Sequence, residues 1–164
     1  TTKIPGTLHA IAALLTDVEA YPKWVYKTTE AWRVRTTDAH EMYYYVVSDF
    51  PWPMDDRDVV VVSRIHQDPN SKALISASSA VSGQIEPRKN CVRMPITETR
   101  WVCSKTSDGQ VEIEYTLKSD PGGLLPDWLV NMALDFGPVE TMKSFKKMVV
   151  DPKYRDAKVD YVTD

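Results

Sequence analysis

The sequence predicts an α+β fold in which a curved antiparallel sheet packs against a long C-terminal helix, with short helices near the N-terminus. Between residues 28 and 118, apolar and polar side chains alternate in short segments, which is typical of strands. Only a few residues separate these segments, and such short connections favour antiparallel neighbours. Helical apolar spacing is confined to the two ends of the chain. We therefore expect about six or seven strands with the helices packed against them.

The bulk composition fits one domain covering residues 1–164. The chain has 164 residues and a formal charge of −3, which is enough length for a sizeable core. Mild acidity argues against a nucleic-acid-binding surface, which would need clustered basic residues. We find no signal peptide, no apolar run long enough to span a bilayer and no disulfide framework. We expect a cytoplasmic protein with at most transient membrane contact.

The N-terminal segment predicts two short helices. Apolar residues recur at helical spacing from Leu8 to Val18, and Thr7 is placed to cap the first turn. Pro22 ends this pattern because proline disfavours helix at the residue before it. A second, short helical turn is expected within residues 17–24.

The middle of the chain contains about six strand patterns. Four consecutive valines in the segment 58–65 predict a strand that is buried on both faces or nearly so. Strict alternation from Val111 to Leu117 predicts a strand with one face in solvent. Pro95 is expected to bend the strand that contains it. The first expected strand begins at residue 28, and the five others cover 42–47, 58–65, 74–81, 92–104 and 111–117.

A long amphipathic helix after the last strand is expected to close a pocket formed by the strands. The triplet Pro121-Gly122-Gly123 predicts the sharp turn before it, because glycine adopts positive φ without steric cost. Gly137-Pro138 is expected to kink or break the helix. The charged segment 151–164 predicts a loose tail. The apolar stripe expected to face the sheet consists of Trp128, Leu129, Met132, Phe136, Val139, Met142 and Phe145.

Four short motifs occur in order along the chain. They are Tyr21-Pro22-Lys23-Trp24, Pro51-Trp52-Pro53 with Arg57-Asp58, Val92-Arg93 followed by Trp101, and Asp120-Pro121-Gly122-Gly123. Together they resemble the START domain, the lipid-transfer module related to steroidogenic acute regulatory protein, over residues 4–150. The chain looks like the compact bacterial members of the START-like and polyketide cyclase superfamily.

This resemblance implies a helix-grip fold, in which the sheet grips the C-terminal helix over a tunnel for one lipid or other hydrophobic molecule. The implied function is binding and transfer of that molecule without catalysis and without a cofactor. The alternative is a polyketide aromatase or cyclase that uses the same cavity. The family has a strand before its first helix, for which only residues 1–4 remain here. A shortened first strand would leave a sheet edge open to pairing, so we expect a monomer or weak dimer.

Aromatic and polar residues along these elements are candidates for the tunnel wall. Arg93 suits a polar anchor because its planar donor fork matches a carboxylate or phosphate, but a structural pair with a buried glutamate is an equal alternative. Arg57 and Asp58 are expected to have structural roles. The candidate ligand-binding residues are Trp24, Tyr43, Tyr45, Arg93, Trp101, Tyr115, Trp128, Met132, Phe136 and Val139.

Catalytic chemistry has little support in the sequence. Nucleophile elbows, phosphate loops, dinucleotide fingerprints and metal-ligand spacings are missing from it. Cys91 and Cys103 lack an identifiable activating base, so inert thiols are expected. The aromatase alternative needs an acid or base facing the pocket. Its candidates are Tyr43, Tyr45, Arg93 and Glu98, although a solvated face is the preferred interpretation for Glu98.

Overall fold

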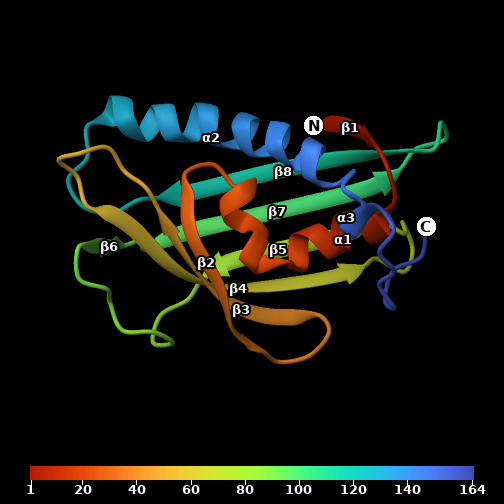
Figure 1. Cartoon of the computed structure of the whole chain (residues 1–164), viewed down its shortest axis with the longest axis horizontal. Coiled ribbons are helices and arrows are strands. Elements are labelled where there is room, and N and C mark those ends of the chain that lie inside the picture. The colour runs from red at the N-terminus through yellow and green to blue at the C-terminus, as the bar shows by residue number, and fades with distance from the viewer.

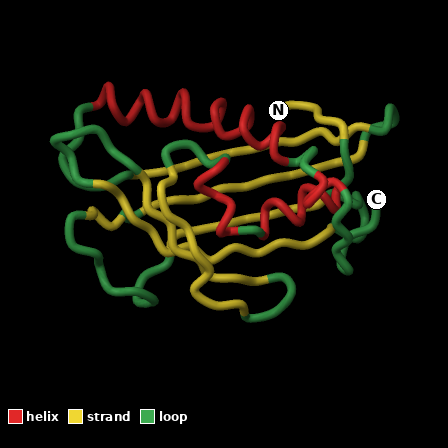
Figure 2. Tube along the Cα trace, viewed as in Figure 1, coloured by secondary structure: helices red, strands yellow, loops and turns green.

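The computed structural model describes residues 1–164 as a curved antiparallel sheet with its helices gathered over one side (Figure 1). Helix α2 (Asp127–Met148) runs along the sheet beside the last strand, whereas α1 (Leu8–Thr16) and the 3₁₀ helix η1 (Val18–Lys23) lie in front of the central strands (Figure 2). A short fourth helix, α3 (Pro152–Arg155), follows α2. The predicted α+β fold class is confirmed.

The sheet is ordered β1-β8-β7-β5-β4-β3-β2, and all of these neighbours pair antiparallel. The short strand β6 lies off this path and pairs parallel with β4. The strands are β1 (Thr2–Pro5), β2 (Thr28–Thr36), β3 (Glu41–Ser48), β4 (Asp56–Gln67), β5 (Leu74–Ala80), β6 (Cys91–Arg93), β7 (Ile96–Lys105) and β8 (Gln110–Asp120).

The sheet therefore has eight strands, against about six or seven predicted. Two short strands account for the difference. The first is β1, with four residues, which forms where the resemblance left room for a shortened first strand; the second is β6, with three residues, which was expected to form one strand with β7. The expected bend at Pro95 is instead a break, because β6 ends at Arg93 and β7 begins at Ile96. Proline interrupts the strand because it supplies no backbone N–H to the hydrogen bonds between strands.

Strand pairing assigns each residue to one face of the sheet. Tyr44 lies opposite Val61, and Ser78 lies opposite Thr99, on the concave face toward the helices. Tyr45 and Val60 lie opposite each other on the convex face, where they form a small separate core. All four valines of β4 are buried, as predicted, because both faces of this central strand are covered.

The C-terminal tail is docked rather than loose, so that prediction is wrong. Tyr154 of α3 is buried and its hydroxyl donates to Asp17 over 2.7 Å, while Val162 is buried further along. A carboxylate oxygen of Asp164 accepts from the backbone N–H of Leu8 over 2.6 Å, next to the N-terminal end of α1. Apolar side chains interspersed among the charges anchor this segment, and a composition-based interpretation underestimates them.

Helix α2 is continuous through Gly137 and Pro138, so the predicted break does not occur. The helix continues although Pro138 cannot donate to the carbonyl of Leu134, and Leu129 and Phe145 are buried on either side of the pair. None of the helices combines the length and apolar character needed to cross a lipid bilayer.

Candidate ligand-binding cavity

A hollow lies between α2, η1 and the concave face of the sheet. It has two adjoining compartments, an inner chamber of about 190 Å³ and an outer chamber of about 130 Å³. The inner chamber is bordered by η1, by the middle of strands β3, β4, β5, β7 and β8, and by the middle of α2. The residues that border both chambers are Tyr26, Ser48, Met94, Leu117, Ser119 and Ala133.

The hollow exists because the residues in the middle of the inner face of α2 have short side chains. Leu129, Ala133, Gly137, Thr141 and Phe145 follow one another at intervals of four residues and so share one face of the helix. Leu129 and Phe145 at the two ends are fully buried against the rest of the protein. Ala133, Gly137 and Thr141 between them border the inner chamber, and their short side chains leave the space beneath the helix unfilled.

Aromatic rings form one end of the inner chamber. The rings of Trp24 and Trp101 border it and meet edge to face, with centroids 6.0 Å apart. Phe145 packs behind them, 5.2 Å from Trp24 and 4.9 Å from Trp101. Tyr115 packs against Trp101 with centroids 4.3 Å apart. Such offset and edge-to-face contacts hold large apolar surfaces in fixed positions, so this wall is rigid.

Hydroxyl groups and the indole N–H of Trp101 supply the polarity that the side chains of the strands bring to the inner chamber. Ser76 and Ser78 on β5 and Thr97 and Thr99 on β7 border it, and Ser78 donates to Ser63 over 2.9 Å. Burial raises the pKa of Tyr44 and Tyr115, so these phenols stay neutral over the physiological range. The chamber is therefore apolar, with neutral hydrogen-bonding groups on its floor.

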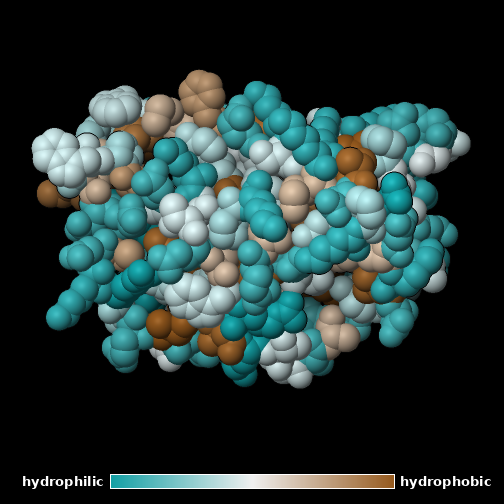
Figure 3. Space-filling model, viewed as in Figure 1, coloured by the Kyte–Doolittle hydropathy of each residue, from teal (hydrophilic) through white to brown (hydrophobic).

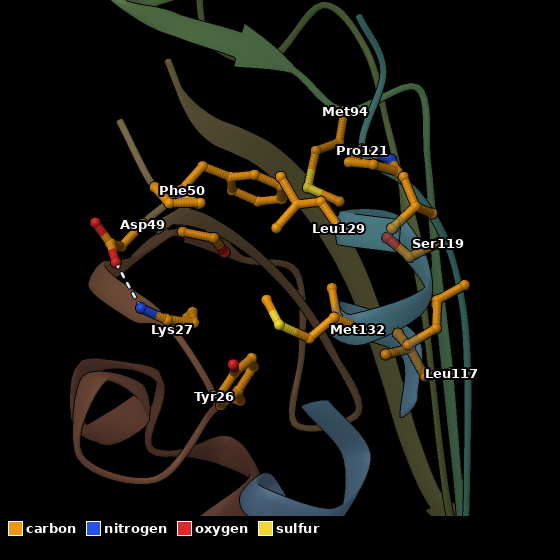
Figure 4. Close-up of a pocket in the computed structure, with 15 residues that line it drawn as sticks. Tyr26, Lys27, Asp49, Phe50, Met94, Leu117, Ser119, Pro121, Leu129 and Met132 are labelled. Atoms are coloured by element: carbon orange, nitrogen blue, oxygen red, sulfur yellow. Dashed lines mark hydrogen bonds and ion pairs between the residues drawn. The ribbon is translucent and has the colours of Figure 1, made fainter. Parts of the chain in front are cut away.

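The outer chamber lies under the first half of α2 and contains the only charged side chains of the hollow (Figure 4). Lys27 donates to Asp49 over 2.9 Å at one side, and this hydrogen bond raises the pKa of Lys27. Met132 projects into the chamber from α2 toward Lys27 and Tyr26, and Leu129 lies beside Phe50 (Figure 4). Flexible methionine side chains adapt to guests of different shape.

The model of the START domain family matches residues 2–153. The chain belongs to the START domain family. Among curated proteins, an uncharacterized protein of Pseudomonas aeruginosa is 28% identical over 145 residues, which cover 88% of this chain and 71% of that protein. START domain-containing protein 10 of Mus musculus is 26% identical over 87% of this chain, and the chain spans about half (49%) of its length.

Solved structures share the fold of this START domain. A STAR-related lipid transfer protein from Xanthomonas axonopodis superposes with a TM-score of 0.79 at 24% identity, covering 90% of this chain and 82% of the other. An aromatase/cyclase from a Streptomyces species superposes with a TM-score of 0.56 at 14% identity, covering 99% and 95%. Both are helix-grip folds at identities that show architecture alone, and the predicted helix-grip fold is confirmed.

In this START domain, four of the ten predicted site residues border the hollow. Trp24, Trp101 and Tyr115 line the inner chamber, and Met132 lines the outer one. Their position makes them available to a guest, while their role in binding stays a prediction.

Three further candidates lie on the opposite, convex face of the sheet. Tyr43 packs under Arg35, whose guanidinium carbon is 3.8 Å from the ring centre. Tyr45 donates to Asp58 over 2.6 Å, and Arg93 forms an ion pair with the same carboxylate over 2.8 Å. Arg93 thus matches its structural alternative, with Asp58 in place of the expected glutamate. Alternation along β3 is the reason for the correction of the two tyrosines, since Tyr44 is the tyrosine of β3 that faces inward.

The last three candidates lie on the solvent side of α2. Trp128 is 63% exposed and Phe136 is 56% exposed, and Val139 is also exposed. The predicted stripe was right at Leu129 and Phe145, which are buried, and wrong at these three exposed positions. Large apolar residues dominate a periodicity pattern, whereas small residues occupy the middle of the face toward the sheet. A helical wheel starting from Leu129 and Phe145 would have found Ala133, Gly137 and Thr141 by their four-residue spacing.

Arg57 fastens the two loops that flank the outer chamber. Its buried guanidinium donates to the carbonyl oxygens of Pro121 over 3.1 Å, Gly122 over 3.0 Å and also Asp55. It also lies over the ring of Phe50, 4.6 Å from the centroid. Gly122 sits in this turn with φ +66°, and a Cβ there would come within 3.0 Å of a proline ring. The structural role expected for Arg57 is therefore to join the loop after β3 to the turn before α2.

Asp58 organises the convex face. Burial alone would raise the pKa of its carboxyl group, but hydrogen bonds from Arg93 and Tyr45 outweigh burial and lower the pKa. Glu98, the remaining candidate acid, lies on the convex side of β7 and pairs with Lys118 over 3.6 Å. The solvated-face interpretation of Glu98 agrees with its exposure. None of the four candidate catalytic groups, Tyr43, Tyr45, Arg93 and Glu98, borders either chamber.

Proposed function

We propose that this START domain binds one hydrophobic small molecule or lipid beneath α2 and transfers it between apolar surroundings. The observation that carries the proposal is the hollow itself, which is bounded by aromatic and aliphatic side chains and roofed by the small residues Ala133 and Gly137. Small apolar-lined cavities of this kind take up apolar guests, because each buried methylene contributes about 0.8 kcal/mol.

The size of the chambers limits what enters without movement. A dry cavity of about 150 Å³ holds one benzene-sized guest. The inner chamber, at about 190 Å³, therefore suits a ring system or a short chain segment. Larger guests require an outward shift of the first half of α2, where Ala133 borders both chambers.

Transfer, rather than storage alone, is supported by apolar side chains exposed around the outer chamber. Trp52 is 92% exposed, and Leu124 is fully exposed at the turn before α2. Each lies within three residues of a residue that borders the outer chamber, as does the exposed Trp128. Brown and pale side chains gather along the upper left edge of the molecule, over the first half of α2 (Figure 3). Clusters of exposed apolar side chains are typical of surfaces that contact membranes or partners transiently.

Mass spectrometry under native conditions, with lipid titration, tests this function. We expect hydrophobic guests to bind with one-to-one stoichiometry, and Met132→Trp to weaken binding at least about tenfold by filling the outer chamber. Asn131→Trp is the matched control, since it adds the same ring to the solvent side of the same helical turn. Equal affinities in wild type and M132W, or no bound guest at all, would refute the proposal.

The aromatase/cyclase alternative has less support. Proton transfer needs a positioned group with a pKa near the working pH, and the side chains around the inner chamber offer only serine, threonine and tyrosine hydroxyls. Turnover of a poly-β-keto substrate that is lost on changing Tyr44→Phe or Tyr115→Phe would favour the alternative. Neither residue was among the sequence-based candidates for catalysis.

A further inference from the structure

We propose that the inner chamber selects an uncharged guest that carries a hydrogen-bond-accepting oxygen, such as a ketone, ester or alcohol, and that Trp24 and Thr28 donate to this oxygen. The inference rests on the proposed binding function and specifies its ligand class. It depends on two independent observations, the charge-free lining of the chamber and two buried polar groups without partners.

The lining of the inner chamber contains no ionised side chain. All of the 23 residues that border it are apolar, glycine, serine, threonine or tyrosine. The nearest charged pair, Lys27 with Asp49, borders the outer chamber and is already satisfied by its own 2.9 Å contact. A carboxylate or phosphate moved into the inner chamber would lose its hydration and meet no cation, which disfavours its charged form.

Two buried polar groups that belong to residues bordering the chamber have no hydrogen-bond partner within the protein. They are Nε1 of Trp24, whose residue is 4% exposed, and Oγ1 of Thr28, whose residue is 6% exposed. Buried polar groups are rarely left unpaired, because each loses its bond to water without replacement. An indole N–H only donates, so its missing partner is an acceptor, and a threonine hydroxyl can donate to the same kind of atom. A guest oxygen supplies that acceptor.

The floor of the chamber offers further neutral groups that can form hydrogen bonds with the guest oxygen. Ser78 and Thr99 lie directly opposite each other on β5 and β7, and Ser76 lies two residues along β5. Hydroxyls both donate and accept, so they tolerate a ketone, an ester or an alcohol equally. These groups together predict that the chamber distinguishes guests by their charge and by whether they carry an oxygen. Guest affinity should depend little on whether that oxygen belongs to a ketone, an ester or an alcohol.

Three ring-sized probes of nearly equal shape separate these contributions. They are acetophenone, a neutral ketone; α-methylstyrene, which replaces the carbonyl oxygen by a methylene; and benzoate, which is ionised at neutral pH. At pH 7.5 the ketone should bind at least about tenfold more tightly than benzoate. Benzoate affinity should rise about tenfold per pH unit of acidification, because only its protonated form enters, while ketone affinity stays constant.

Variants then test the two donors. Thr28→Val keeps the shape of the side chain and should weaken ketone binding about fivefold without changing alkene binding, as expected for one lost hydrogen bond. Trp24→Phe should weaken binding of both probes, because it also removes part of the aromatic wall, and should weaken ketone binding more than alkene binding. Thr29→Val is the control, because Thr29 is exposed on the adjacent position of β2. The pH series uses the wild-type protein, so the charge selectivity is tested even if a variant folds poorly.

The outcomes distinguish the inference from the function it rests on. Benzoate binding as tightly as the ketone, with no pH dependence, would overturn the charge selectivity and leave hydrophobic binding in place. Equal losses of ketone and alkene binding in T28V, or no loss of either, would overturn the role of the oxygen. If none of the three probes binds while the protein remains folded, the proposed function and this inference are both refuted.

Discussion

The two halves of α2 are attached to the protein in different ways. In the second half, Phe145 is completely buried among the rings of Trp24 and Trp101, and Val149 is buried one turn later. In the first half, Leu129 is the only buried large side chain, and the residues that follow it border the hollow. One helix therefore serves as an anchor at one end and as a roof at the other.

This difference indicates where movement costs least. Segments with few buried apolar contacts open at a lower free energy than the core of the same domain. The first half of α2 is held mainly by Leu129 and by the loops that Arg57 joins. A guest would enter beneath this half while Phe145 keeps the second half in place.

Removing the anchor should have the largest effect. Phe145→Ala should lower the free energy of unfolding by about 4 kcal/mol, since it empties the centre of the aromatic cluster. Leu129→Ala should cost less, about 2 kcal/mol, because its surroundings border space that already exists. Chemical denaturation of both variants measures the difference. Equal costs would show that the two halves of the helix are held alike.

Releasing the two loops that Arg57 joins should have the second-largest effect on stability. Arg57→Met should lower the free energy of unfolding by about 2 to 3 kcal/mol, because buried carbonyl oxygens lose a charged donor. The turn at residues 120–126 should be cleaved faster in limited proteolysis, and bound guests should dissociate faster. Arg64→Met is the matched control on the same strand, since Arg64 is exposed and pairs with Glu41 at the surface. An R57M protein with unchanged guest dissociation would contradict the role of Arg57 at the outer chamber.

Changing the convex face should reduce stability without affecting the roof. Asp58→Asn should cost about 2 kcal/mol at neutral pH by weakening the bonds from Arg93 and Tyr45. Because the folded-state pKa of Asp58 lies below its ordinary value of 3.8, the stabilisation is fully present above about pH 4 and is lost as the pH falls through the folded-state pKa.

The stability gap between wild type and D58N should therefore narrow below pH 4, as measured by denaturation across a pH series. Guest affinity at neutral pH should be unchanged, because Asp58 does not border either chamber. A constant gap down to pH 2 would contradict the lowered pKa.

Stiffening the roof should have the smallest effect on stability, and in the opposite direction. Gly137→Ala should raise the free energy of unfolding by up to about 1 kcal/mol, because glycine is a poor helix former. The added Cβ would lie 3.5 Å from Cδ1 of Tyr26, an ordinary contact. Guest affinity should fall modestly, since the methyl group narrows the inner chamber. Thermal denaturation and titration measure the two effects, and a destabilised G137A would mean that the helix backbone is not relaxed at this position.

Much of the fold could be predicted because its signals are local. The alternation from Val111 to Leu117 specifies β8, and the four valines specify a central strand whichever way it pairs. The START motifs predicted the order of elements. Periodicity alone could not set the bounds of the short strands β1 and β6, because three or four residues carry no periodic pattern and pair only with β8 and β4.

The candidate site was harder to predict because it depends on side-chain direction. Tyr43, Tyr44 and Tyr45 are alike in the sequence, yet a shift of one residue in register exchanges the faces they occupy. The stripe on α2 was misassigned since its inner positions include alanine and glycine, which carry little hydrophobic signal. Asp58 and Arg93 are 35 positions apart, and the parallel pairing of β6 with β4 joins them.

The sequence by itself determined the fold family, the central strands and the closing helix, because these follow from periodicity and turn residues within short windows. Only the tertiary structure decided which residues surround the hollow, that its inner chamber is free of charge and that the tail is docked. The physical reason is that a cavity consists of space left between side chains from distant segments. Its walls are set by the register of the strands and the rotation of α2, and no short stretch of sequence contains either.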